Sequence, residues 1–123
     1  MKLENTGIDG LTINVRALNR LMGLHGFILG ESWDYERVTY DYKIASNEKN
    51  VTYYIRIQGY ALEGDVDRGD ALIKIKTPLL GKHYYPFGVE YGEDENFPEN
   101  LVKRAHDLVI GVKEEIEKQL STT

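Results

Sequence analysis

The residues of this chain best suited to acid–base chemistry gather in one short stretch. His83 stands in the run GKHYYP at 81–86, where an imidazole adjoins two phenols and an ammonium group. A histidine titrates near neutral pH, so it can exchange a proton with a ligand or bind it. The alternative is an aromatic cluster that seals the end of a sheet. A pocket here would use six residues: His83, Tyr84, Tyr85, Tyr91, Glu63 and Glu90.

No familiar catalytic or metal-binding pattern accompanies this stretch. The chain has no cysteine, and its three histidines are too far apart in sequence to form a ligand pair on one helix. Phosphate-binding glycine motifs, G-x-S-x-G and H-E-x-x-H are all missing from the sequence. Asp65, Asp67 and Asp70 form one acidic cluster and residues 90–95 another, and we interpret both as solvated turns because the first lacks the EF-hand spacing. We therefore expect no metal and no cofactor, and the residues favour a non-enzymatic protein over an enzyme without deciding between them.

A second group of candidate residues comes from strand parity. In three predicted strands, apolar residues alternate with polar ones, so one face of the sheet should lie against a core and the other in solvent. The solvent face carries five cations against Asp41, a net charge of +4, which leaves −9 for the rest of a chain whose total is −5. Such a face can bind acidic protein surfaces, phosphorylated ligands or stacked bases, although lysines also protect ordinary sheets from aggregation. The residues predicted for this face are Arg37, Lys43, Tyr54, Arg56, Tyr60, Lys74 and Lys76.

The hydrophobic pattern predicts the elements that position these residues. Gly26 closes a short amphipathic helix, polar turns at 46–50 and 64–70 join three strands into a meander, and Gly59 marks a bulge or a close approach. The predicted strands are 11–15, 37–44, 51–62 and 71–76, and the first helix is 16–25.

The last part of the chain divides into a long loop and a long helix. Residues 79–97 are predicted to form a structured loop with a short strand near 89–91. Asn96 and Pro98 should start the helix, with Glu99 favourable at the positive end of its dipole. The apolar stripe predicted for this helix comprises Leu101, Ala105, Leu108, Val112, Ile116 and Leu120, flanked by Val102 and Val109.

These patterns predict one domain, 1–123, of the α+β class. We expect a two-layer fold with an antiparallel sheet of four to five strands, and both the short N-terminal helix and the long C-terminal helix on one face. The net charge disfavours nucleic acid as a partner, and no apolar stretch is long enough to span a membrane. The absence of cysteine and of a signal peptide favours the cytoplasm.

Four segments, at 33–41, 59–66, 80–86 and 88–98, resemble the YugN-like family. The resemblance extends along the whole chain from residue 4 to the last helix. It implies a small cytosolic protein of spore-forming bacteria and their relatives. The family offers no catalytic or binding residues to transfer, so the function must be inferred from the residues themselves.

The residues leave three hypotheses for function. The leading one is a non-enzymatic binding or interaction protein that contacts a protein partner or self-associates as a homodimer through its sheet. The first alternative is a small-molecule receptor or enzyme with a pocket around His83, Tyr84 and Tyr85. The second is single-stranded nucleic-acid binding on the basic sheet face.

Overall fold

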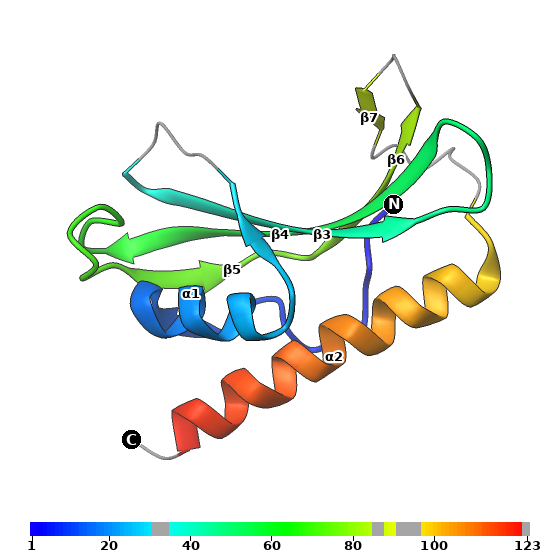
Figure 1. Ribbon diagram of the computed structural model, residues 1–123. Helices are drawn as coiled ribbons and strands as arrows, with labels where there is room; N and C mark the ends of the chain where they lie inside the picture. The colour runs from blue at the N-terminus through cyan, green and yellow to red at the C-terminus, as the bar shows by residue number, and fades with distance from the viewer. Residues whose placement is uncertain (31–34, 85–87, 91–96, 122–123) are drawn as a thin grey trace.

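In the computed structural model, seven strands form one antiparallel sheet and two helices cover one of its faces (Figure 1). The structure describes residues 1–30, 35–84, 88–90 and 97–121. The predicted α+β class, with the short and the long helix on the same face, is confirmed. In chain order the elements are β1 (Thr12–Asn14), α1 (Val15–Leu24), β2 (Ile28–Leu29), β3 (Arg37–Ala45), β4 (Val51–Glu63), β5 (Leu72–Ile75), β6 (Leu79–Tyr84), β7 (Gly88–Glu90) and α2 (Glu99–Ser121).

Strand β4 organises the sheet because every long pairing involves it. β3 runs antiparallel along one side, while β6 and β5 pair with the first and second halves of the other side. β1 extends the sheet beyond β5, and β2 extends it beyond β3. The amino group of Met1 donates to the carbonyl of Leu80 at 3.0 Å, so the start of the chain covers part of the β6 edge. The two predicted hairpin turns connect β3 to β4 and β4 to β5.

Local signals explain where helix α1 begins and ends. The Asn14 side chain accepts a hydrogen bond from the Arg16 amide at 2.9 Å, which caps the first turn. Gly26, at φ +85°, takes the left-handed conformation just beyond the C-cap residue His25, as its glycine predicted. The helix buries Val15, Leu18, Leu21 and Met22 against the sheet.

Helix α2 crosses the same face of the sheet and begins directly after Pro98. The carbonyl of Pro98 accepts from the amides of Leu101 and Val102, both at 3.1 Å. The predicted cap Asn96 lies outside the described residues. Leu108 is only half-buried and Leu120 is 41% exposed, so the centre of the stripe runs through Val109. The buried positions are Leu101, Ala105, Val109, Val112 and Ile116.

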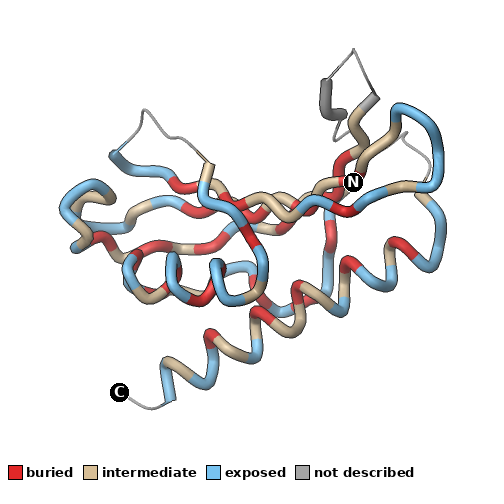
Figure 2. The backbone as a smooth tube through the Cα atoms, viewed as in Figure 1, coloured by how far each residue is buried: buried red, intermediate tan, exposed pale blue. Residues whose placement is uncertain are grey.

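The core lies between the sheet and the two helices, as the buried positions in Figure 2 show. Tyr40 is the largest fully buried side chain, and its hydroxyl donates to Oδ1 of Asn19 on α1. Burial raises the pKa of Tyr40 above its ordinary value of 10.0. This hydrogen bond therefore joins β3 to α1 through a phenol that stays neutral.

The stretch predicted as a loop at 79–97 is largely strand where the structure describes it. Residues 79–84 form β6 and residues 88–90 form β7, while 85–87 and 91–96 are not described. Without β6, the first half of β4 would expose an unpaired row of backbone groups. The sequence of β6 lacks clean alternation, so its strand conformation depends on the pairing with β4 rather than on its own pattern.

Candidate binding site on the helix-free sheet face

One face of the sheet carries no helix, and strand parity determines which side chains it presents. In β4, Tyr53, Ile55 and Ile57 are buried under the helices, and the alternate positions are partly accessible. All seven residues predicted for the solvent face occupy such alternate positions in β3, in β4 or along β5 up to Lys76. The helices lie below the sheet in Figure 1, and this face looks upward.

Two cross-strand rows near the end of β4 bring charged and polar residues together. In the first row, Tyr60 is paired with Arg37 on β3 and with Lys74 on β5. In the second, Gln58 is paired with Thr39, and its carbonyl accepts from the amide of Lys76 at 2.8 Å. A groove of about 490 Å³ lies at these rows, and Glu36 also lines it. The lining includes Arg37, Thr39, Gln58, Tyr60 and Lys76.

An ion pair occupies the centre of the face. Nε and Nη2 of Arg56 donate to the two carboxylate oxygens of Asp41 at 2.8 and 3.0 Å, a bidentate arrangement across the β3–β4 pair. The pair is internally neutral. The net charge of +4 predicted for the face is therefore carried by Arg37, Lys43, Lys74 and Lys76.

The three lysines of the face, Lys43, Lys74 and Lys76, form no ion pair within the part of the chain that the structure describes. Lys43 is paired with Tyr54, toward the other end of β4. The Tyr54 ring meets His83 edge-on, with the ring centroids 6.4 Å apart. The face thus has two aromatic positions, with the Arg56–Asp41 pair between them.

The structure places Glu63 far from His83, whereas Glu90 is paired with Lys82, the neighbour of His83. His83 is paired with Thr52 at the start of β4, whereas Glu63 ends the same strand opposite Leu72. Eleven residues of strand separate the two, about 36 Å. Tyr85 and Tyr91 lie outside the described residues, and Tyr84 and Glu90 belong to β6 and β7. Glu63 is therefore not part of any site that contains His83.

The acidic turn between β4 and β5 uses its carboxylates to hold itself together. Asp65 Oδ1 accepts from the amides of Asp67 and Arg68 at 2.8 and 3.4 Å, and Asp70 Oδ1 accepts from the Asp65 amide at 2.7 Å. Nη2 of Arg16 donates to the carbonyl of Arg68 at 3.1 Å and ties the turn to α1. Across the described ranges, no group of three or more histidines and acidic residues could hold a metal ion.

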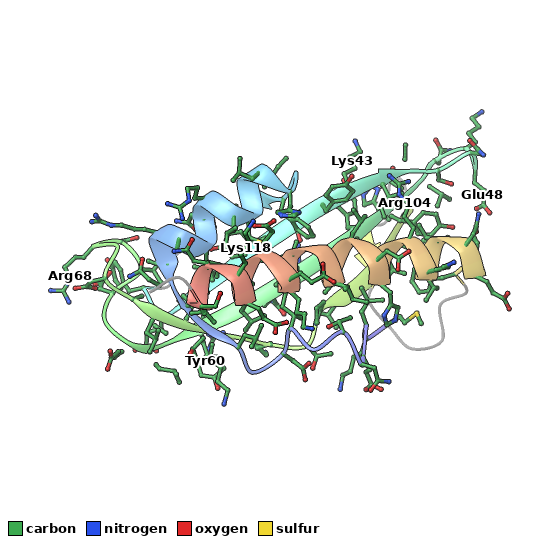
Figure 3. The ribbon with its side chains drawn as sticks, turned by 90° about the horizontal axis from the view of Figure 1, so that it is seen from below. Lys43, Glu48, Tyr60, Arg68, Arg104 and Lys118 are labelled. Carbon is green, nitrogen blue, oxygen red and sulfur yellow. The ribbon has the colours of Figure 1, made fainter. Side chains whose placement is uncertain are left out.

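A second hollow, of about 350 Å³, lies between the β3–β4 turn and the start of α2. Glu48 and Arg104 line it, and both are labelled at the same end of the molecule in Figure 3. Tyr53 also lines it, and its ring packs on Phe97 with centroids 5.9 Å apart. This hollow lacks the grouped cations of the helix-free face, so we regard it as the weaker candidate.

Arg37, Lys76 and Tyr60 of the groove were among the residues predicted to bind, whereas Thr39, Gln58 and Glu36 were not. Strand alternation does place Thr39 and Gln58 on the solvent face, but it does not mark them as binding residues. Their position beside Lys76 depends on the register of β5, which the sequence does not specify.

Among the described residues, neither helix is apolar enough over a sufficient length to cross a membrane.

Comparisons with known proteins find bacterial relatives of this chain. The model of the YugN-like family matches residues 3–109. The uncharacterized protein YlbA of Bacillus subtilis (strain 168) is 49% identical over 109 residues, which cover 89% of each chain. The uncharacterized protein YugN of the same strain is 26% identical over 85 residues, covering 69% of this chain and 62% of the relative. The crystal structure of a YugN protein from Geobacillus kaustophilus HTA426 is 48% identical, with a TM-score of 0.84 and 98% of each chain covered.

Proposed function

This chain belongs to the YugN-like family, and we propose that it is a non-enzymatic binding protein whose interaction surface is the helix-free face of the sheet. The observation that carries the proposal is the group of three lysines, Lys43, Lys74 and Lys76, without carboxylate partners in the described part of the chain. On a protein of net charge −5, a lysine-rich face departs locally from the mean charge of the molecule. Their grouping favours an anionic partner.

The charge of the face also bears on self-association. A symmetric dimer in which two copies bury the same face would set one group of four cations against another, which is electrostatically unfavourable. A second copy would fit better if it contributed its acidic turn at 65–70 instead. Self-association through the sheet remains a prediction. The charges favour an arrangement in which the acidic turn of one copy contacts the helix-free face of the other.

A ligand screen on two matched variants tests the proposal. The first variant, K43Q/K74Q/K76Q, removes the three lysines from the face, and the second, K103Q/K118Q, removes exposed lysines from α2. Thermal unfolding is followed with an acidic peptide, a mononucleotide, a short single-stranded oligonucleotide and a neutral sugar. At least one anionic compound should raise the unfolding temperature of the native protein and of the α2 variant but not of the face variant.

Two outcomes would contradict the proposal. One is that no anionic compound stabilises the native protein. The other is that stabilisation survives in K43Q/K74Q/K76Q but is lost in K103Q/K118Q, which would move the interaction surface to α2. Sedimentation equilibrium on the same proteins measures self-association, and a dimer that persists in both variants would exclude the helix-free face as its interface.

A further inference from the structure

The groove at the end of β4 is small and defined, unlike the rest of the helix-free face. Its volume is about 490 Å³, and pockets that bind small molecules typically enclose about 300–1,000 Å³. A stable protein interface instead covers about 800 Å² on each partner and needs a broad surface. The dimensions of the groove therefore favour a small ligand.

Cations from two different strands flank the groove. Arg37 on β3 and Lys76 beyond β5 lie on opposite sides of β4 and in adjacent rows, about 12 Å apart at the backbone, because each strand spacing is about 4.8 Å and the rows lie about 6.7 Å apart. Both side chains are long enough to reach a group held above β4. Lys74 adds a third cation beside Tyr60, while Glu36 adds one carboxylate to the rim, so the surroundings remain net positive.

The floor between these cations offers neutral hydrogen-bonding groups and an aromatic ring. Gln58 and Thr39 supply an amide and a hydroxyl from neighbouring strands. Tyr60, which is 39% exposed, supplies a ring that can pack on a flat ligand. Oxyanions suit the cations and the donors, and a planar ring suits the tyrosine.

From this arrangement we infer that the groove holds a small organic anion, in which an oxyanion lies between Arg37 and Lys76 and a flat ring packs on Tyr60. The inference rests on the proposed function, because it assigns a ligand class to the same face. The oxyanion is a phosphate or a carboxylate, which both satisfy these donors. Each has a simple probe: AMP for the phosphate and benzoate for the carboxylate.

Calorimetric titration of the full chain tests the inference. AMP should bind about tenfold more tightly than adenosine, and benzoate about tenfold more tightly than benzyl alcohol, because the two uncharged compounds cannot form the charge-assisted hydrogen bonds. Replacing Lys76 by glutamine should raise the Kd about tenfold, and Tyr60→Leu should also weaken binding. Lys103→Gln is the matched control, because Lys103 is an exposed lysine of α2, on the other side of the sheet, and should leave the Kd unchanged.

The outcomes separate this inference from the proposed function. If an acidic peptide or an oligonucleotide binds the face while AMP and benzoate do not, the small-ligand inference is wrong and the proposed function stands. If no anionic probe binds at all, both fail. If AMP or benzoate binds equally well to the native protein and to Lys76→Gln, the ligand lies elsewhere and the inference is again wrong.

Discussion

Gly59 offers a stringent test of the packing beneath the helix-free face. It lies in β4 opposite Val38 and Ile75, and it is buried. A Cβ built on Gly59 would lie 2.4 Å from Cγ2 of Ile73 and 3.1 Å from the carbonyl oxygen of Lys74. Carbon atoms in contact normally lie about 3.5–4.0 Å apart, so Ile73 would have to move by about 1 Å or more. Ile73 is itself fully buried and has little room to do so.

We therefore expect Gly59→Ala to destabilise the protein. Overpacking of a core typically costs about 1–3 kcal/mol. The loss of glycine flexibility from the unfolded chain offsets about 0.4–1 kcal/mol of this. A net loss of about 1–2 kcal/mol should lower the Tm by about 3–8 °C for a chain of this size. Urea denaturation gives the free energy of unfolding directly.

Two further variants test whether the contact with Ile73 causes the destabilisation expected of Gly59→Ala. Ile73→Ala removes the clashing methyl group and alone should cost about 2–5 kcal/mol. In Gly59→Ala combined with Ile73→Ala, the loss should be smaller than the sum of the single losses by about 1 kcal/mol. Gly111→Ala in α2 is the control, because nothing lies within 4 Å of its Cβ, and it should stabilise by about 0.5–1 kcal/mol. A Gly59→Ala protein as stable as the native one, or strict additivity with Ile73→Ala, would refute the close-packing argument.

Three other predictions follow from single contacts. Burial raises the pKa of Tyr40 in the folded state, so the stability that its neutral phenol contributes is fully present below pH 10.0 and is lost as the pH rises further. Above pH 10.0, the free energy of unfolding of the native protein should therefore fall about 1.4 kcal/mol per pH unit more steeply than that of Tyr40→Phe. Parallel curves of unfolding free energy against pH for the two proteins would contradict this prediction. Gly69→Ala should cost about 1–2 kcal/mol, measured by urea denaturation, because its φ of +76° is strained for a residue with a Cβ. The flexible end of the Arg16 side chain can move aside, and an unchanged midpoint would show that the turn adapts freely. Asp41→Asn should cost about 1 kcal/mol by removing the ion pair between Asp41 and Arg56, yet strengthen anion binding on the face. Weaker binding would count against an electrostatic mechanism.

Alternation along β3 and β4 was sufficient to predict which residues face the helices and which face solvent. Gly59 was predicted to mark a bulge or a close approach. A Cβ built at this position would lie only 2.4 Å from Cγ2 of Ile73, which confirms the close approach. Both inferences succeed because they depend on local geometry, namely the two-residue period of a strand and the missing side chain of glycine.

The remaining features depend on register and pairing between distant segments. β6 forms against the first half of β4 although its own sequence shows no clear alternation. The Arg56–Asp41 pair and the row that joins Lys76 to Gln58 both require the exact alignment of neighbouring strands. The predicted grouping of Glu63 with His83 was wrong because the length of β4 holds them far apart.

The inference that the groove holds a small organic anion is tested by amide chemical shifts measured during titrations with AMP and with benzoate. In Figure 3, Tyr60 lies nearer the Arg68 end of the molecule and Lys43 nearer the Glu48 end, so shift changes at the groove can be distinguished from changes at the other end of the face. We expect the largest shift changes on residues 37–39, 58–61 and 76, which line the groove. Changes confined to α1 and α2, or no changes with either compound, would contradict it.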